Sequence, residues 1–291
     1  MASIRKKLTA NVKGDFYVDS SCINCGTCRF IAPDTFNDKD RQSRVYKQPE
    51  TDKQTLRAEM AVISCPTSSI GSEEKHDLSR AIAAFPEPID ENVFHCGFHS
   101  KLSFGGAGYF IKRPEGNVMV DSPRFDKALV KRIEEMGGIK YIFLSHRDDV
   151  ADQKKYYNHF GCERIMHIDD ITTETEDIER KIEGIKPVEI ENDLLGIPVP
   201  GHTKGSVCLL YRDKYLFTGD HLAMNPNRDH PTAFNNHCWY SWEEQIKSMK
   251  KIAEYGFEWI LPGHSLRCHF PKDEMAEKIQ MCIDWMEKLK V

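Results

Sequence analysis

Three cysteines at three-residue spacing constrain this chain more than any other feature. Cys22, Cys25 and Cys28 stand in one short stretch, and Cys65 follows later in the chain, directly before Pro66. One loop with this spacing can supply three corners of a cubic iron-sulfur cluster, and a cysteine followed by proline typically supplies the fourth. The spacing therefore predicts one 4Fe-4S cluster held by these four thiolates.

Zinc bound by the same four cysteines is the alternative. Structural zinc sites usually combine two Cys-x-x-Cys pairs, whereas this chain has a cysteine triple and a single cysteine before proline. The pattern therefore favours the cluster. Cys25, in the middle position, favours a four-iron over a three-iron form.

The segment around these cysteines resembles a bacterial-type ferredoxin domain, a small α+β fold that carries single electrons. In two-cluster relatives the first motif continues to a further Cys-Pro, and the matching position here is Ala32-Pro33. The resemblance therefore implies a single cluster. We expect this domain to span residues 1–80, with a helical pattern over residues 55–63 that leads into Cys65.

Composition limits the partners of the chain. Its 291 residues carry a net charge of −5 with a pI near 6.2, which gives no electrostatic reason to bind nucleic acid or an anionic membrane. No apolar stretch approaches the roughly 18 residues of a membrane span, and residues 1–14 lack the apolar core of a signal peptide. We therefore expect a cytoplasmic protein. The cysteines outside the motif are expected to be buried thiols: Cys96, Cys162, Cys208, Cys238, Cys268 and Cys282.

A second domain is expected over residues 91–291, after a linker of residues 81–90 in which Pro86 and Pro88 prevent a continuous helix. Short strand and helix patterns alternate in this domain, which is typical of a fold with a sheet at its core. The patterns predict a helix over 124–136, a charged and solvated segment over 174–183, and an amphipathic helix over 279–291.

Polar residues follow a buried strand pattern in the middle of this domain. The apolar run over residues 141–144 leads into His146, Asp148, Asp149 and Asp152. One imidazole beside three carboxylates is the kind of ligand set that a hard or borderline cation accepts. The alternative is a helix that Asp148 or Asp149 caps.

Three later strand patterns end in a similar way. In each, a glycine follows the apolar run and precedes a side chain that can bind a metal, namely His202, Asp220 or His264. One such turn is common on protein surfaces. Four in chain order indicate loops that converge on one metal site.

These motifs resemble those of the metallo-β-lactamase superfamily: a His-x-His-x-Asp-His loop, a Gly-His-Thr-x-Gly-Ser turn, a Gly-Asp after a strand and a late Pro-Gly-His. Asp121 matches a further aspartate at an early strand end. The resemblance covers residues 91–291. It implies a four-layer αββα fold with a two-metal cleft where the strands end.

The first motif departs from the family pattern. Asp148 stands where the second histidine belongs, and Val150-Ala151 stand where Asp-His belongs. A shift of two residues would give Asp152 the aspartate role, with Gln153 in the position of the histidine. The resemblance then implies one metal held by His146, Asp148, His202 and Asp220, and another held by Asp220, His264 and Asp152. His221 or Asp149 could complete the second site.

Three functions are compatible with this sequence. A carboxylate in place of an imidazole favours iron or manganese over zinc, and flavodiiron relatives of the fold carry the same exchange, so iron is the first expectation. We therefore expect the cluster to reduce an iron centre that acts on a small oxidant or substrate, with a separate redox protein as electron partner. The alternatives are a hydrolase with one or two metal ions, with Asp220 and Asp152 as the catalytic carboxylates, and a metal-binding domain without turnover.

Two further features stay open. His95, His99, His167 and His269 lie beside strand patterns, where they could orient ligands or simply pack. The aromatic segment over residues 225–242 could line a substrate cleft or cover the sheet.

Overall fold

The computed structural model describes residues 2–289 and divides into two compact units. The first comprises Met1–Lys140 and Ala151–Phe160, and the second comprises Tyr141–Val150 and Gly161–Val291. The predicted domain boundaries near residues 80 and 90 remain predictions, because the division into units falls elsewhere. The segment predicted as a linker contains the end of helix α3 (Ser79–Ala83) and strand β5 (Glu87–Asp90).

The first part of unit 1 is built from two small antiparallel sheets and two helices. Strands β1 (Phe16–Val18) and β4 (Ile70–Ser72) form one pair, and β2 (Phe36–Lys39) and β3 (Gln42–Val45) form a hairpin. A short 3₁₀ helix, η1 (Ile4–Lys6), precedes them, and helices α1 (Thr27–Ile31) and α2 (Asp52–Ser64) complete the α+β arrangement. The helix predicted before Cys65 is confirmed.

Local chemistry explains the ends of α2. The Thr51 hydroxyl accepts a hydrogen bond from Gln54 N, which is the usual N-cap contact. The Gln54 side chain in turn accepts from Glu50 N. The helix ends at Cys65, whose backbone is extended. At its far side, His76 joins Asp15 and Glu59 through its two ring nitrogens.

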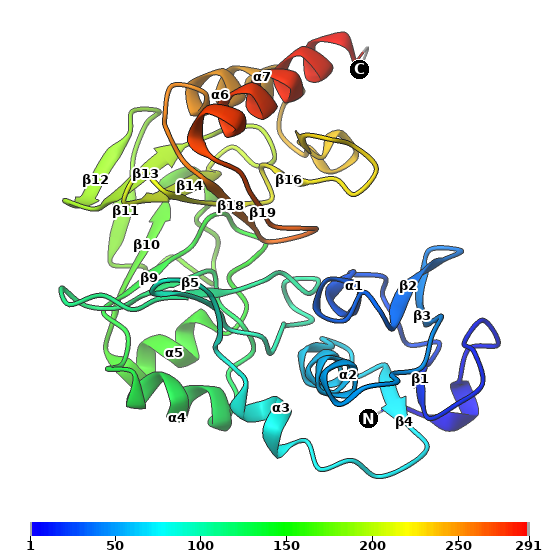
Figure 1. Ribbon diagram of the computed structural model, residues 1–291. Helices are drawn as coiled ribbons and strands as arrows, with labels where there is room; N and C mark the ends of the chain where they lie inside the picture. Colours follow the sequence, from blue (N-terminus) through cyan, green and yellow to red (C-terminus); the bar gives the residue numbers. More distant parts are fainter. Residues whose placement is uncertain (1, 290–291) are drawn as a thin grey trace. The chain divides into compact units, whose positions relative to one another are not determined.

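The rest of unit 1 is an antiparallel meander with helices. Strand β5 pairs with β6 (Val93–His95), which pairs with β7 (Tyr109–Ile111), which pairs with β8 (Val118–Val120). Helices α4 (Lys127–Glu135) and α5 (Gln153–Phe160) appear together in green in Figure 1. Asp126 caps α4, and Gly138 N donates to Ile133 O at its end, so the helix predicted over residues 124–136 is confirmed.

Unit 2 contains strands from two sheets. Parallel strands β9 (Tyr141–Phe143), β10 (Glu163–His167) and β11 (Arg180–Ile182) lie side by side. The other sheet runs in the order β12 (Val188–Glu191), β13 (Leu194–Pro198), β14 (Val207–Tyr211), β15 (Tyr215–Gly219), β18 (Trp259–Pro262) and β19 (Cys268–His269). Shorter elements are η2 (Ile168–Asp170), β16 (Ala223–Met224), β17 (Pro231–Thr232) and η3 (Asn235–His237).

Two helices cover one face of the second sheet. Helices α6 (Trp242–Ile252) and α7 (Lys272–Lys288) run side by side, in orange and red in Figure 1. Their buried Met249, Ile279 and Ile283 join Leu216 and Ile260 of the sheet in one apolar core. This core fixes β15 and β18, whose ends carry two of the predicted metal ligands.

Two expectations need correction. Residues 174–183 are mostly exposed, as predicted, but Ile178 and Ile182 are buried and β11 belongs to a sheet. The closing helix begins at Lys272, seven residues before the prediction. Among residues 2–289, no helix combines the length and apolar character that a bilayer span requires.

Candidate metal centres

The four predicted cluster cysteines line one cavity in unit 1. Cys28 lies in α1, Cys65 ends α2, and the loop that carries Cys22 and Cys25 turns at Gly26 with φ of 86°. This positive φ is readily adopted only by glycine. The fold therefore brings together the four cysteines that the sequence predicts as cluster ligands.

The donor set fits an iron-sulfur cluster. Asn24 N donates to Cys22 Sγ at 3.4 Å, and Ser69 N donates to Cys65 Sγ at 3.2 Å. Backbone donors of this kind stabilise the negative charge of a cluster. Burial raises the pKa of Cys28 to about 12, so that thiol would stay protonated unless a cation bound it.

In unit 2, the strand β9 carries the chain toward His146. Leu144 N donates to Ile165 O and prolongs the pairing with β10, and Ser145 O accepts from Val207 N. The Ser145 hydroxyl lies 2.9 Å from His146 Nδ1. The other ring nitrogen, His146 Nε2, is buried and has no hydrogen-bond partner among residues 2–289, as expected of a nitrogen that binds a metal.

His202 is held in the same way from another loop. Its Nδ1 lies 2.5 Å from His237 O, and because a carbonyl only accepts, Nδ1 carries the proton. The Nε2 atom therefore has a free lone pair, and it is buried without a hydrogen-bond partner. This is the usual way in which a backbone carbonyl orients a metal-binding histidine.

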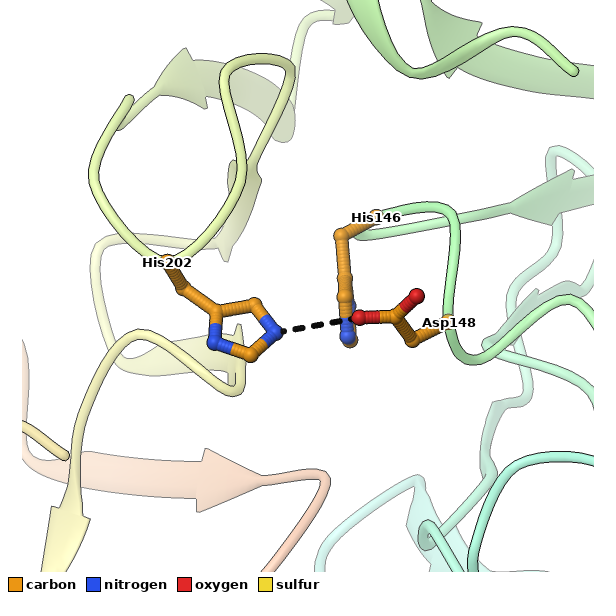
Figure 2. A group of neighbouring side chains, drawn as sticks. All are labelled: His146, Asp148 and His202. Carbon is orange, nitrogen blue, oxygen red and sulfur yellow. Dashed lines mark ion pairs between the residues drawn. The ribbon is translucent and has the colours of Figure 1, made fainter. Parts of the chain in front are cut away.

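Asp148 completes a group with these two histidines. Its Oδ2 lies 3.4 Å from His202 Nε2, and Figure 2 shows the two side chains pointing toward each other beside the His146 ring. One ligand atom from each residue lies within 4.8 Å of the other two. Metal bonds of about 2.1 Å place opposite ligands about 4.2 Å apart, so the spacing suits one cation.

Asp220 lies at the centre of the site. Its Oδ2 is 3.9 Å from both His146 Nε2 and His202 Nε2, and its Oδ1 accepts from His264 Nδ1 at 2.8 Å. His146, Asp149 and Asp220 form a second compact group of possible ligands. The structure thus brings together the predicted ligands of unit 2, and of the two residues offered to complete the second site it groups Asp149 with His146 and Asp220.

Asp152 is differently engaged. Its carboxylate accepts from Phe125 N at 2.8 Å and from Lys155 Nζ at 2.7 Å, within unit 1. Its predicted role as a ligand and catalytic group remains a prediction. The alternative that Asp148 or Asp149 caps a helix is wrong, because α5 begins only at Gln153.

Glycines leave room for the carboxylates. A Cβ on Gly263 would lie 2.7 Å from Asp149 Oδ2 and 3.0 Å from Asp220 Oδ1. Gly219 has φ of 49°, and a Cβ there would crowd Ser145 and lie 3.2 Å from His146 Nδ1. Glycine is therefore required at these two strand ends, because the neighbouring side chains approach its Cα too closely for a Cβ.

Asp170 is an organising residue that sequence reasoning missed. Its buried carboxylate accepts hydrogen bonds from Arg147 N at 3.0 Å, Thr203 Oγ1 at 2.5 Å and Gly205 N at 2.8 Å. It thereby joins the loop that carries His146 to the loop that carries His202. Only its place after a strand, within Asp169-Asp170, hinted at this role.

The electrostatics also suit a cation. Burial lowers the pKa of His146 to about 4, so the ring is neutral and its lone pair is available. Burial alone would raise the pKa of Asp220, but the charge of His264 and its hydrogen bond hold that pKa below the ordinary value. Contact with His202 lowers the pKa of Asp148. Both carboxylates are therefore ionised near neutral pH.

Comparison with known proteins identifies a ferredoxin domain and a fold. Residues 18–72 match the family model of the 4Fe-4S single cluster domain of Ferredoxin I. Among solved structures, the chain is similar to DIM-1 metallo-β-lactamase exposed to ceftazidime, with 16% identity and a TM-score of 0.52 over 68% of this chain and 95% of that chain. The chain joins a single-cluster ferredoxin domain to a metallo-β-lactamase fold.

Further solved structures support the metallo-β-lactamase fold. FIM-1 from Pseudomonas aeruginosa, in its mono-zinc form, has 14% identity and a TM-score of 0.51, over 69% of this chain and 95% of that chain. A metallo-β-lactamase from Pontibacter korlensis has 14% identity and a TM-score of 0.50, over 69% and 98%. The predicted fold class, an α+β ferredoxin domain followed by an αββα metallo-β-lactamase fold, is confirmed.

The aromatic segment before α6 contacts the metallo-β-lactamase site. Trp239 N donates to His202 O at 2.9 Å, and the rings of Trp239 and His202 have centroids 6.2 Å apart. Trp239 and Tyr240 are both exposed. Of the two alternatives for this segment, the contact with His202 favours a place beside the site.

Proposed function

We propose that this protein is a redox metalloenzyme in which the ferredoxin cluster supplies single electrons to an iron centre in the metallo-β-lactamase fold. The observation that carries the proposal is Asp148, which takes the place of a histidine and forms a group with His146 and His202. Two histidines and one carboxylate are the typical ligands of non-haem iron. An electron-carrying domain in the same chain provides a source of reducing equivalents.

The residues of the site have separable roles. His146 and His202 present neutral Nε2 atoms to the cation, since Ser145 contacts one ring and the His237 carbonyl fixes the tautomer of the other. Asp148 and Asp220 add negative charge that favours iron over zinc. When bound, the iron would supply one-electron redox chemistry and the cluster would deliver the electrons.

The exposed Trp239 and Tyr240 provide apolar surface next to His202. Such residues could hold a small organic substrate beside the metal and exclude water from it. A separate one-electron donor protein would reduce the cluster. These partner assignments belong to the proposal.

Hydrolysis is the second candidate. The groups His146–Asp148–His202 and His146–Asp149–Asp220 overlap, so one residue set could hold two cations that share ligands. A bridged pair of that kind would lower the pKa of a bound water to ~7 and activate it as a nucleophile. In that case the cluster would be a structural or sensory group.

Metal content and one exchange of ligands test the choice. Protein purified without oxygen should contain more than four irons per chain, because the cluster accounts for four. Asp148→His should shift the preference of the second centre from iron toward zinc and leave cluster iron unchanged. Asp169→Asn, on an exposed neighbouring loop residue, is the matched control.

Other metal contents would favour one of the two alternative functions. Two zinc ions with only cluster iron, together with turnover of esters or thioesters that Asp148→His does not reduce, would favour hydrolysis. Cluster iron with no further metal would favour a binding domain without turnover.

A further inference from the structure

Two buried histidines lie beside the ferredoxin cluster site in unit 1. His95 ends β6 and His99 lies in the loop that follows, and each has only 4% of its surface exposed. Their Nε2 atoms are 2.9 Å apart. Sequence reasoning left open whether these histidines pack or orient other groups.

This loop reaches the cluster ligand Cys25. Gly105 of the loop packs so closely that an added Cβ would lie 2.8 Å from Cys25 Cβ and 3.0 Å from its Sγ. Thr27, the first residue of α1 (Figure 1), has its hydroxyl 3.3 Å from Cys25 Sγ and 3.3 Å from His99 Nδ1. One hydroxyl therefore separates the histidine pair from a cluster sulfur.

Hydrogen-bond partners determine the tautomers. His99 Nδ1 lies 2.6 Å from Gly105 O, and because the carbonyl only accepts, this nitrogen carries a proton. A neutral His99 then has an unprotonated Nε2, which accepts from His95 Nε2–H. In a neutral His95, Nδ1 is therefore the unprotonated nitrogen.

Thr27 continues the same direction toward the sulfur. Its hydroxyl lies 3.3 Å from each of His99 Nδ1, Gly105 O and Cys25 Sγ, and its proton can point to Gly105 O or to the sulfur. A Cys25 thiolate is the stronger acceptor of the two, because a charged acceptor binds more strongly than a neutral one. His95 Nε2–H, and the Thr27 proton when it faces Cys25, then point toward the cluster, while His99 Nδ1–H is held mainly by Gly105 O. Such a chain favours additional negative charge on the cluster.

A carboxylate beside His95 already has a cationic partner. Glu87 Oε2 of β5 lies 3.6 Å from His95 Nδ1. Arg57 of α2 contacts the other oxygen of Glu87 and balances its charge. Tyr109 of β7 presents its ring 6.1 Å from the His95 ring. Since Arg57 is paired with Glu87, added negative charge on the cluster would favour a proton on His95.

We propose that the His95–His99 pair, with Glu87, is a proton-uptake site coupled to reduction of the ferredoxin cluster. When a one-electron donor protein reduces the cluster, His95 Nδ1 takes one proton from solvent and forms an ion pair with Glu87. The electron and the proton enter together, and both leave on reoxidation. The inference goes beyond the proposed function, because it depends on the cluster alone and not on the reaction at His146 and His202.

A redox titration of the full-length, cluster-loaded protein tests the coupling. Between pH 6 and 9 the midpoint potential of the cluster should fall as pH rises, by up to 59 mV per pH unit. For a one-electron couple, 59 mV corresponds to a tenfold change in an equilibrium constant. His95→Gln keeps a donor toward His99 and removes the protonation site, so it should abolish the pH dependence at unchanged cluster content. His76→Gln, a histidine of the same unit that is bonded to Asp15 and Glu59, should keep the wild-type slope.

A second measurement uses only the wild-type protein. Reduction in weakly buffered solution with a pH-indicating dye should show uptake of close to one proton per electron within the same pH window. A potential that does not change with pH, or a His95→Gln protein with the wild-type slope, would overturn the proposal. Protein that binds no cluster on reconstitution would overturn it as well, whatever metal the second centre holds.

Discussion

Asp170→Asn should loosen the metal site of the metallo-β-lactamase fold without touching a ligand. The carboxylate accepts three buried hydrogen bonds, from Arg147 N, Thr203 Oγ1 and Gly205 N. An asparagine can place its oxygen toward only one side, so its NH₂ group must face a donor. Gly205 N–H would then lose its acceptor, because that N–H alone bonds Oδ1.

The magnitude follows from these contacts. A buried donor without a partner costs about 1–3 kcal/mol, and the two remaining hydrogen bonds lose about 1 kcal/mol each when the acceptor becomes neutral. We therefore expect the unit to lose about 3–5 kcal/mol of stability. Since Asp170 aligns the loops of His146 and His202, metal affinity should fall by about ten- to a hundredfold.

The assay is metal competition against a chromogenic chelator, with cluster content followed separately by visible absorption. Asp169→Asn is the matched control, because Asp169 is partly exposed and pairs with the exposed Lys204. An exposed pair of this kind contributes about 1 kcal/mol or less. Wild-type metal affinity in Asp170→Asn would refute the role assigned to this carboxylate.

Three further predictions follow from single contacts. Burial lowers the pKa of His76, but hydrogen bonds to its two carboxylate partners raise that pKa by more. The stability that the protonated His76 adds is therefore present below about pH 6.5 and is lost as pH rises through the raised pKa. NMR titration of His76 and a flatter profile of stability against pH in His76→Gln would check this. Gly263→Ala should reduce metal content because its Cβ would crowd two carboxylates, whereas Gly256→Ala has nearest neighbours at 3.6 Å and should not. Trp239→Ala should raise the KM for a small organic substrate with metal and cluster content unchanged, as steady-state kinetics on matched preparations would show.

The ferredoxin site could be predicted from the sequence because its ligands are local. Cys22, Cys25 and Cys28 fall within seven residues, so their spacing alone defines a loop around one cluster. The glycine-flanked His202, Asp220 and His264 were also predictable, because an apolar strand and a glycine precede each one.

The first metallo-β-lactamase motif was harder to interpret. Spacing cannot distinguish Asp149 from Asp152 when the family pattern is broken. The distinction depends on the backbone after β9, which places Asp149 near His146 and Asp220. Asp152, directly before α5, instead accepts a hydrogen bond from Phe125 N. Asp170 was missed for a similar reason, because its three partners are 23 to 35 residues away along the chain and no local pattern marks it.

The central claim is that the cluster and the second metal centre form one redox system. A reductive titration of anaerobically purified protein, followed by electron paramagnetic resonance, counts the electrons that each chain accepts. The account predicts two electrons per chain, one in the cluster and one in an iron centre, and a single electron in the His202→Ala variant. One electron per chain in both proteins, with zinc in the second centre, would contradict it.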